Sequence, residues 1–211
     1  MAPHLLSRTR AARMPQAEIT IQGDFGRARM GATPWQILGP PTKDPGDSLR
    51  RVQAKYFLDN YDLPALIASR IRDMEKAVAT TSVNDEYNLN EHYKDCLKRL
   101  REISLATLPD DVQKQIEILR EVEAIGSSAV DNILDIKAVS SGPAEFVAVE
   151  LTPTQLRECF GTDRPSQDMA LKQTWKAFAL IDRGMCACFP VYGPTRPRRC
   201  TGWYFVGYTA D

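Results

Sequence analysis

The chain is poor in the residues on which many catalytic and metal-binding sites depend. Its 211 residues include five cysteines and only two histidines, His4 and His92. A zinc site built from His92, Cys186 and Cys188 lacks an obvious fourth ligand, and two cysteines one residue apart do not have the usual Cys-x-x-Cys spacing. An odd number of cysteines does not form a disulfide framework, so we expect free thiols in a reducing compartment. The sequence predicts no metal and no cofactor.

Phosphate-binding motifs and membrane-spanning runs are also absent. Neither Gly-x-x-x-x-Gly-Lys-Ser/Thr nor Gly-x-Gly-x-x-Gly occurs in the sequence. No apolar run approaches the roughly 20 residues that a transmembrane helix requires. Lysine and arginine together number 27, as do aspartate and glutamate, so the net charge favours neither nucleic acid nor an acidic membrane. We therefore expect a non-enzymatic protein without a transmembrane segment.

The first residues of the chain have an uneven charge. Residues 1–17 contain Arg8, Arg10 and Arg13 and no acidic residue. Such a composition is typical of a mitochondrial or plastid targeting peptide, and it would equally suit a basic arm on an acidic surface such as RNA. Whether the segment is cleaved stays open. Without targeting, the expected location is the cytoplasm.

Proline, glycine and periodicity divide the chain into three parts. Residues 1–47 are rich in proline and glycine, which predicts an extended arm. Residues 48–139 are expected to be mainly helical, and residues 144–211 to form a small sheet-containing unit. The predicted fold class is α+β.

Two features of the predicted arm could be ordered. Ile19–Gln22 could add a short strand to a sheet. Trp35 and Ile37, with Leu38, have the character of an apolar anchor that must be buried in this protein or in a partner. We therefore predict Trp35 and Ile37 as partner-binding residues.

The clearest periodic pattern lies between Leu63 and Ile103. Apolar residues recur there at steps of three and four in two stretches joined by a polar link at 80–84. This spacing predicts two amphipathic helices in an antiparallel hairpin whose apolar stripes face each other. The stripes are Leu63, Leu66, Ile67, Ile71, Met74 and Val78 in the first helix, and Leu89, Tyr93, Cys96, Leu97, Leu100 and Ile103 in the second.

Part of this pattern resembles the UVR motif, the helical hairpin of UvrB- and UvrC-type proteins and of some bacterial and plastid adaptors. The matching residues are Met74-Glu75-Lys76-Ala77, Tyr87, Lys94-Asp95, Leu97, Lys98 and Leu100. Asn90-Glu91 stands where the family has two small residues, and the link is longer. The resemblance is confined to residues 63–103 and implies a docking element. It implies a hairpin core of Leu66, Met74, Tyr87, Tyr93 and Leu97, with Arg70, Lys94 and Asp95 at the surface as partner-binding residues.

Local signals predict the remaining elements. Further helices are expected at 48–59 with Ser48 as cap, at about 109–123 with Pro109 in the first turn, at about 130–136, and after the caps Thr152 and Ser166. Strands are expected at 145–151, 177–181, 185–192 and 203–208.

Basic residues precede an aromatic run near the end of the sequence. Arg196, Arg198 and Arg199 are followed closely by Trp203-Tyr204-Phe205. Arginines beside exposed aromatic rings can bind single-stranded RNA through phosphate contacts and base stacking. The alternative is a basic loop that leads into a buried strand.

These patterns leave three functions open, the first of which is preferred. The chain is predicted to be an adaptor or a peripheral subunit of a larger assembly, whose partners are other proteins. The alternative is an RNA-associated or nucleoprotein subunit, ribosome-associated or coat-like, that contacts phosphates through Arg8, Arg10, Arg13, Arg196, Arg198 and Arg199. The third is an enzyme with a site around Cys186, Cys188 and Asp182. His92 and Cys96 are predicted to be a surface histidine beside a half-buried cysteine rather than a catalytic pair.

Overall fold

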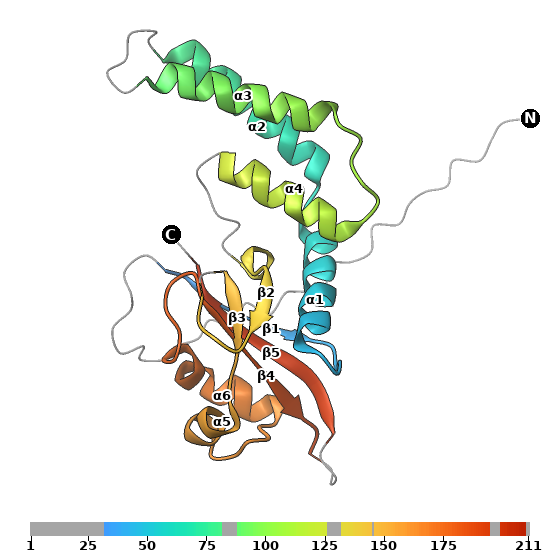
Figure 1. The fold of residues 1–211 in the computed structure, drawn as a ribbon, viewed down its shortest axis with the longest axis vertical. Coiled ribbons are helices and arrows are strands. Elements are labelled where there is room, and N and C mark those ends of the chain that lie inside the picture. The colour runs from blue at the N-terminus through green and yellow to red at the C-terminus, as the bar shows by residue number, and fades with distance from the viewer. Residues whose placement is uncertain (1–31, 82–87, 126–131, 145, 195–198, 210–211) are drawn as a thin grey trace, which may run out of the picture.

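The computed structural model describes residues 32–81, 88–125, 132–144, 146–194 and 199–209. Within them, five strands form one mixed sheet in the order β1-β5-β4-β3-β2 (Figure 1). The strands are β1 (Pro34–Gly39), β2 (Ala138–Ser140), β3 (Val147–Glu150), β4 (Cys186–Tyr192) and β5 (Cys200–Tyr208). β5 runs antiparallel to both β1 and β4, whereas β2, β3 and β4 are parallel to one another. The predicted α+β class is confirmed.

Helices cover both faces of the sheet (Figure 1). The described helices are α1 (Pro45–Asn60), α2 (Leu63–Thr80), α3 (Leu89–Leu105), α4 (Val112–Ile125), α5 (Pro153–Phe160) and α6 (Gln167–Phe178). Of these, α2 and α3 lie away from the sheet, against each other and against α4 (Figure 1). One core contains residues of α1, α2, α3 and α4 together with Trp203 and Phe205 of β5. The other core contains residues of α5 and α6 together with Tyr204 and Val206 of β5. Because β5 is buried on both faces, its apolar residues run almost without interruption.

Capping residues begin α5 and α6 where the sequence predicts. Thr152 and Gln155 form a capping box at the start of α5, and Gly161, with a φ of 72°, ends that helix. The Ser166 hydroxyl accepts a hydrogen bond from the Met169 amide at 3.2 Å and so begins α6. These caps satisfy amide groups that have no partner inside the helix.

Two helices begin at different residues from those predicted. α1 starts at Pro45, because the Asp44 carboxylate accepts from the Gly46 amide at 3.0 Å. Ser48, the predicted cap, is buried, and its hydroxyl donates to the Pro40 carbonyl at 2.8 Å. Likewise α4 starts at Val112 and not at Pro109, because the Asp111 carboxylate accepts a hydrogen bond from the Lys114 amide at 3.0 Å.

The predicted arm at 1–47 requires correction over its last part. Pro34–Gly39 is an edge strand paired with β5, and α1 begins soon after it. The sheet therefore takes strands from all three predicted parts of the chain, because β2 begins at Ala138, within 48–139. Ile19–Gln22 lies outside the described residues, as does the Arg-rich beginning of the chain.

Two short apolar runs also differ from the prediction. The strand expected at 177–181 is absent, because Ala177 and Phe178 end α6 and a turn follows. The helix expected at 130–136 is, in its described part, a single 3-10 turn at Ile133–Asp135, and β2 follows it. No helix in the described segments is long and apolar enough to cross a membrane.

Candidate functional site

α2 and α3 form the antiparallel hairpin that the periodicity predicts. Asp62 caps α2 by accepting from the Ala65 amide at 3.1 Å. Asn90, at the start of α3, donates from its side-chain amide to the carbonyls of Val78 at 3.1 Å and Thr81 at 2.9 Å. Since Asn90 is only 3% exposed, these bonds fix the beginning of α3 against the end of α2. The sequence shows Asn90 only as a departure from the UVR pattern, so its structural role was not predicted.

α4 packs against one end of this hairpin through ion pairs and one thiol contact. Arg70 of α2 pairs with Glu123 of α4, and their side chains are 29% and 10% exposed. Arg99 of α3 pairs with Glu121 at 3.3 Å. The Cys96 thiol donates to the carbonyl of Ile125, the last residue of α4, at 3.6 Å. Arg70 was predicted at the hairpin surface, but the structure places it in this internal contact.

The other end of the hairpin extends beyond α4 (Figure 1). In α2 only Leu63 and Ile67 are buried, and both lie in its first five residues. Met74 and Val78 are half-buried, and Leu89 of α3 is 39% exposed. The two helices thus continue for about two turns without a third helix against them in the described structure.

The remaining residues of the predicted hairpin site occupy different environments. Lys94 and Asp95 are exposed, as predicted, and the Lys94 ammonium lies 2.6 Å from the Glu91 carboxylate. Leu97 is buried. Leu66, Met74 and Tyr93 are half-buried, and Tyr87 lies outside the described residues.

Trp35 and Ile37, predicted as partner anchors, pack within the protein itself. Both lie on β1 and contact the core beneath α1. The Trp35 ring crosses Gly207 of β5 so closely that a Cβ atom there would lie 2.2 Å from ring atom Cζ2. The anchor is therefore used inside the molecule, where it attaches the edge strand to the sheet.

The aromatic half of the predicted RNA site is not accessible. Trp203, Tyr204 and Phe205 lie within β5 and are 6%, 2% and 0% exposed, so their rings cannot stack on bases. Arg199 is exposed. The other predicted phosphate contacts, Arg8, Arg10, Arg13, Arg196 and Arg198, lie outside the described residues. The three aromatic residues therefore fit the alternative prediction, in which a basic loop leads into a buried strand.

Burial makes Cys186 and Cys188 poor nucleophiles. Both point from β4 into the core beneath α1 and are 0% exposed. Desolvation by burial raises the pKa of each thiol well above its ordinary value. Because the thiolate is the reactive form, the chemistry proposed for an enzyme at these residues is strongly disfavoured at neutral pH. Asp182 is exposed after α6 and lies outside both cores.

The pair formed by His92 and Cys96 is close to the arrangement predicted. The His92 Nε2 atom lies 3.6 Å from the Cys96 sulfur one helical turn away on α3. His92 is exposed, whereas Cys96 is 7% exposed and its thiol also donates to the Ile125 carbonyl. The thiol therefore sits under α4, away from an approaching substrate. Among the described residues, no group of three or more His, Cys, Asp or Glu side chains could hold a metal ion.

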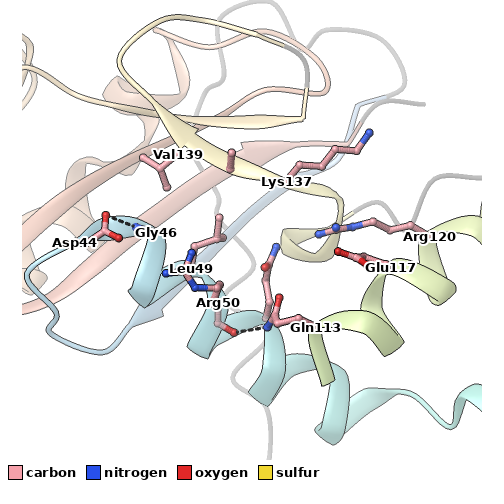
Figure 2. Close-up of a pocket in the computed structure, with 11 residues that line it drawn as sticks. Asp44, Gly46, Leu49, Arg50, Gln113, Glu117, Arg120, Lys137 and Val139 are labelled. Carbon is pink, nitrogen blue, oxygen red and sulfur yellow. Dashed lines mark hydrogen bonds between the residues drawn. The ribbon is translucent and has the colours of Figure 1, made fainter. Parts of the chain in front are cut away.

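A hollow of about 410 Å³, which the sequence did not indicate, lies between the first turn of α1, α4 and β2 (Figure 2). Its charged lining residues are Asp44, Arg50, Glu117, Arg120 and Lys137. Arg120 donates to the carbonyls of Leu134 and Ile136, and burial lowers the pKa of its guanidinium. The Lys137 ammonium lies 5.3 Å from the centre of the Phe146 ring. The hydrogen bonds of Arg120 join α4 to the segment before β2, and the Lys137 contact joins that segment to the residue before β3.

Comparisons with protein-family models, curated proteins and solved structures found no match to this chain. The geometry of the hairpin therefore carries the functional argument.

Proposed function

We propose that this protein is a non-enzymatic protein–protein interaction module, an adaptor or a peripheral subunit of a larger assembly, and that the α2–α3 hairpin is its docking element. The observation that carries the proposal is the incomplete burial of α2. Thirteen of its residues, 68–80, include none that is buried, although Ile71, Met74 and Val78 repeat at helical spacing among them.

An amphipathic helix in water gains most of its stability by covering its apolar face. Two helices side by side cover only part of each other, whereas a third element completes the coverage, as α4 does for the first half of α2. A partner that packs on the second half would supply the missing contact. Exposed charges of both signs surround it, as on the rim of a protein–protein interface. The resemblance to the UVR hairpin supports the same role.

The proposal is tested by purifying the tagged full-length protein from its native cells at low and moderate salt, with and without nuclease. Two charge-swap variants address the hairpin: Arg72→Asp with Asp73→Arg on α2, and Lys94→Glu with Asp95→Lys on α3. A matched control swaps the exposed pair on α1, Lys55→Asp with Asp59→Lys, whose side chains are 78% and 55% exposed. Each swap conserves net charge and changes only exposed side chains. The surface ion pairs affected, Lys94 with Glu91 and Lys55 with Asp59, are each worth about 1 kcal/mol or less.

We expect a fixed set of protein partners that survives moderate salt and nuclease, is lost with at least one hairpin swap, and is kept by the control. Far-UV circular dichroism and urea unfolding establish that all variants fold. Partners kept by both hairpin swaps would refute docking through the hairpin. Partners lost with nuclease would instead support the RNA-associated alternative.

A further inference from the structure

We use the word groove for the side of α2 and α3 against which α4 packs. In the described residues this side of the hairpin continues past Ile125, the last residue of α4. Arg70, which pairs with Glu123, and Arg99, which pairs with Glu121, mark the sides of α2 and α3 that face α4. Residues three, four and seven positions away on a helix lie on the same side. Counting outward, these positions are Asp73, Met74 and Ala77 on α2, and Asp95 and His92 on α3. The contact between Cys96 and Ile125 shows that α4 ends at this level.

This continuation of the groove, defined by Asp73, Met74, Ala77, His92 and Asp95, has apolar material at its base. Met74 and Ala77 are half-buried, and Leu89, three positions before His92 on α3, is 39% exposed. In the first part of the groove, Val122 and Ile125 of α4 lie in one core with Ile67 and Cys96 of the hairpin. A helical element of the same type therefore fits the second part.

The charges along the groove change sign where α4 ends. In the first part the hairpin supplies the cations Arg70 and Arg99, and α4 supplies the carboxylates. Among the five positions that define the second part, the exposed carboxylates are Asp73 and Asp95. An occupant with the charge of α4 would meet repulsion there, whereas a basic one would meet opposite charges on both sides.

We infer that this second part of the groove binds a basic amphipathic helix of a partner protein, which lies in line with α4 and presents Lys or Arg to Asp73 and Asp95. The inference rests on the proposed docking role of the hairpin and adds the chemistry of its partner. Recognition of this type uses apolar anchors at helical spacing on the partner, with charges flanking them.

Site-specific photo-crosslinking from full-length protein in its native cells tests the inference. The photoreactive residue p-benzoylphenylalanine replaces Asp73 or His92 in the groove, and Lys76 or Lys98 as exposed controls on neighbouring faces of the same helices. Mass spectrometry then identifies the crosslinked segment. We expect both groove positions to capture one segment of another protein, with apolar residues at steps of three and four and a net positive charge. The control positions should capture at least fivefold less of it.

A synthetic peptide of the captured segment provides the second measurement. Its affinity for the purified full-length protein should fall at least tenfold on Asp73→Lys with Asp95→Lys, and change less than twofold on the control Asp168→Lys of α6. Equal affinity for the two variants would overturn the inference, as would capture of an acidic or non-helical segment, of a second copy of this chain, or of its own residues. Capture from Lys76 and Lys98 alone would overturn it too, yet leave hairpin docking intact. If neither hairpin swap causes a loss of partners, the proposed function itself is refuted.

Discussion

Replacing Arg70 by methionine removes the cation that links the hairpin to α4. The Glu123 side chain, 10% exposed, would then be a nearly buried carboxylate without its partner. Breaking a fully buried pair costs about 3–5 kcal/mol. Arg70 is 29% exposed, so solvent reduces the effect. We expect Arg70→Met to lower the free energy of unfolding by about 2–3 kcal/mol, which corresponds to a fall in Tm of roughly 4–12 °C.

The reverse change should cost less. Glu123→Leu leaves Arg70 with a long side chain that can reach water, so a loss of about 1 kcal/mol is expected. The double variant Arg70→Met with Glu123→Leu has no unpaired charge and a new apolar contact, and should lie within about 1 kcal/mol of the wild type. The two changes are therefore coupled by at least about 2 kcal/mol.

Urea unfolding followed by far-UV circular dichroism measures all four proteins, with a constant m-value as the check on two-state behaviour. Arg101→Met serves as the control, because it removes an exposed pair with Glu75 whose side chains are 56% and 47% exposed. That control should lose less than about 1 kcal/mol. Additive single effects, with a coupling below about 0.5 kcal/mol, would refute the reasoning and show that apolar packing alone holds the hairpin.

Three further predictions follow from the cores. Gly207→Val should destabilise the protein by about 1–3 kcal/mol in urea unfolding, because the new side chain displaces the Trp35 ring; Gly142→Ala, where nothing lies within 4 Å of the added Cβ, should change little. The free energy of unfolding should fall as pH rises above about 8.5, because Cys186 and Cys188 have raised pKa values when folded and ionise first when unfolded. Each thiol contributes up to about 1.4 kcal/mol per pH unit, so Cys188→Ala should reduce the slope between pH 8.5 and 10; an unchanged slope would contradict this. A disulfide reagent at neutral pH should modify half-exposed Cys200 quickly and Cys186 and Cys188 only as fast as the protein unfolds, as read by mass spectrometry of timed samples.

Local signals in the sequence predicted the elements whose determinants lie within a few residues. The hairpin follows from apolar spacing within Leu63–Ile103, and the starts of α5 and α6 follow from Thr152 and Ser166. The short apolar run at 177–181 fits a strand as well as the end of a helix, and only its packing under β4 and β5 decides for the helix.

Elements that depend on distant partners were not predictable in this way. β1 is a strand because β5 pairs with it, and nothing near Trp35 in the sequence indicates that Gly207 provides the space for its ring. The same limit applies to the site. The exposure of Lys94 and Asp95 follows from helical spacing, whereas the internal position of Arg70 depends on Glu123, 53 residues away.

The pairing of β1 with β5 also bears on the order in which the protein can fold during synthesis. Thr33 and Thr209, which bond to each other at the end of this strand pair, are 176 residues apart. At a translation rate of about 5–20 residues per second, β1 emerges from the ribosome roughly 10–35 seconds before its partner strand. The hairpin and α4 contain mostly local contacts and can form in that interval, whereas the edge strand with its tryptophan must wait unpaired. We therefore expect the nascent chain to present Trp35 to chaperones until β5 has been made.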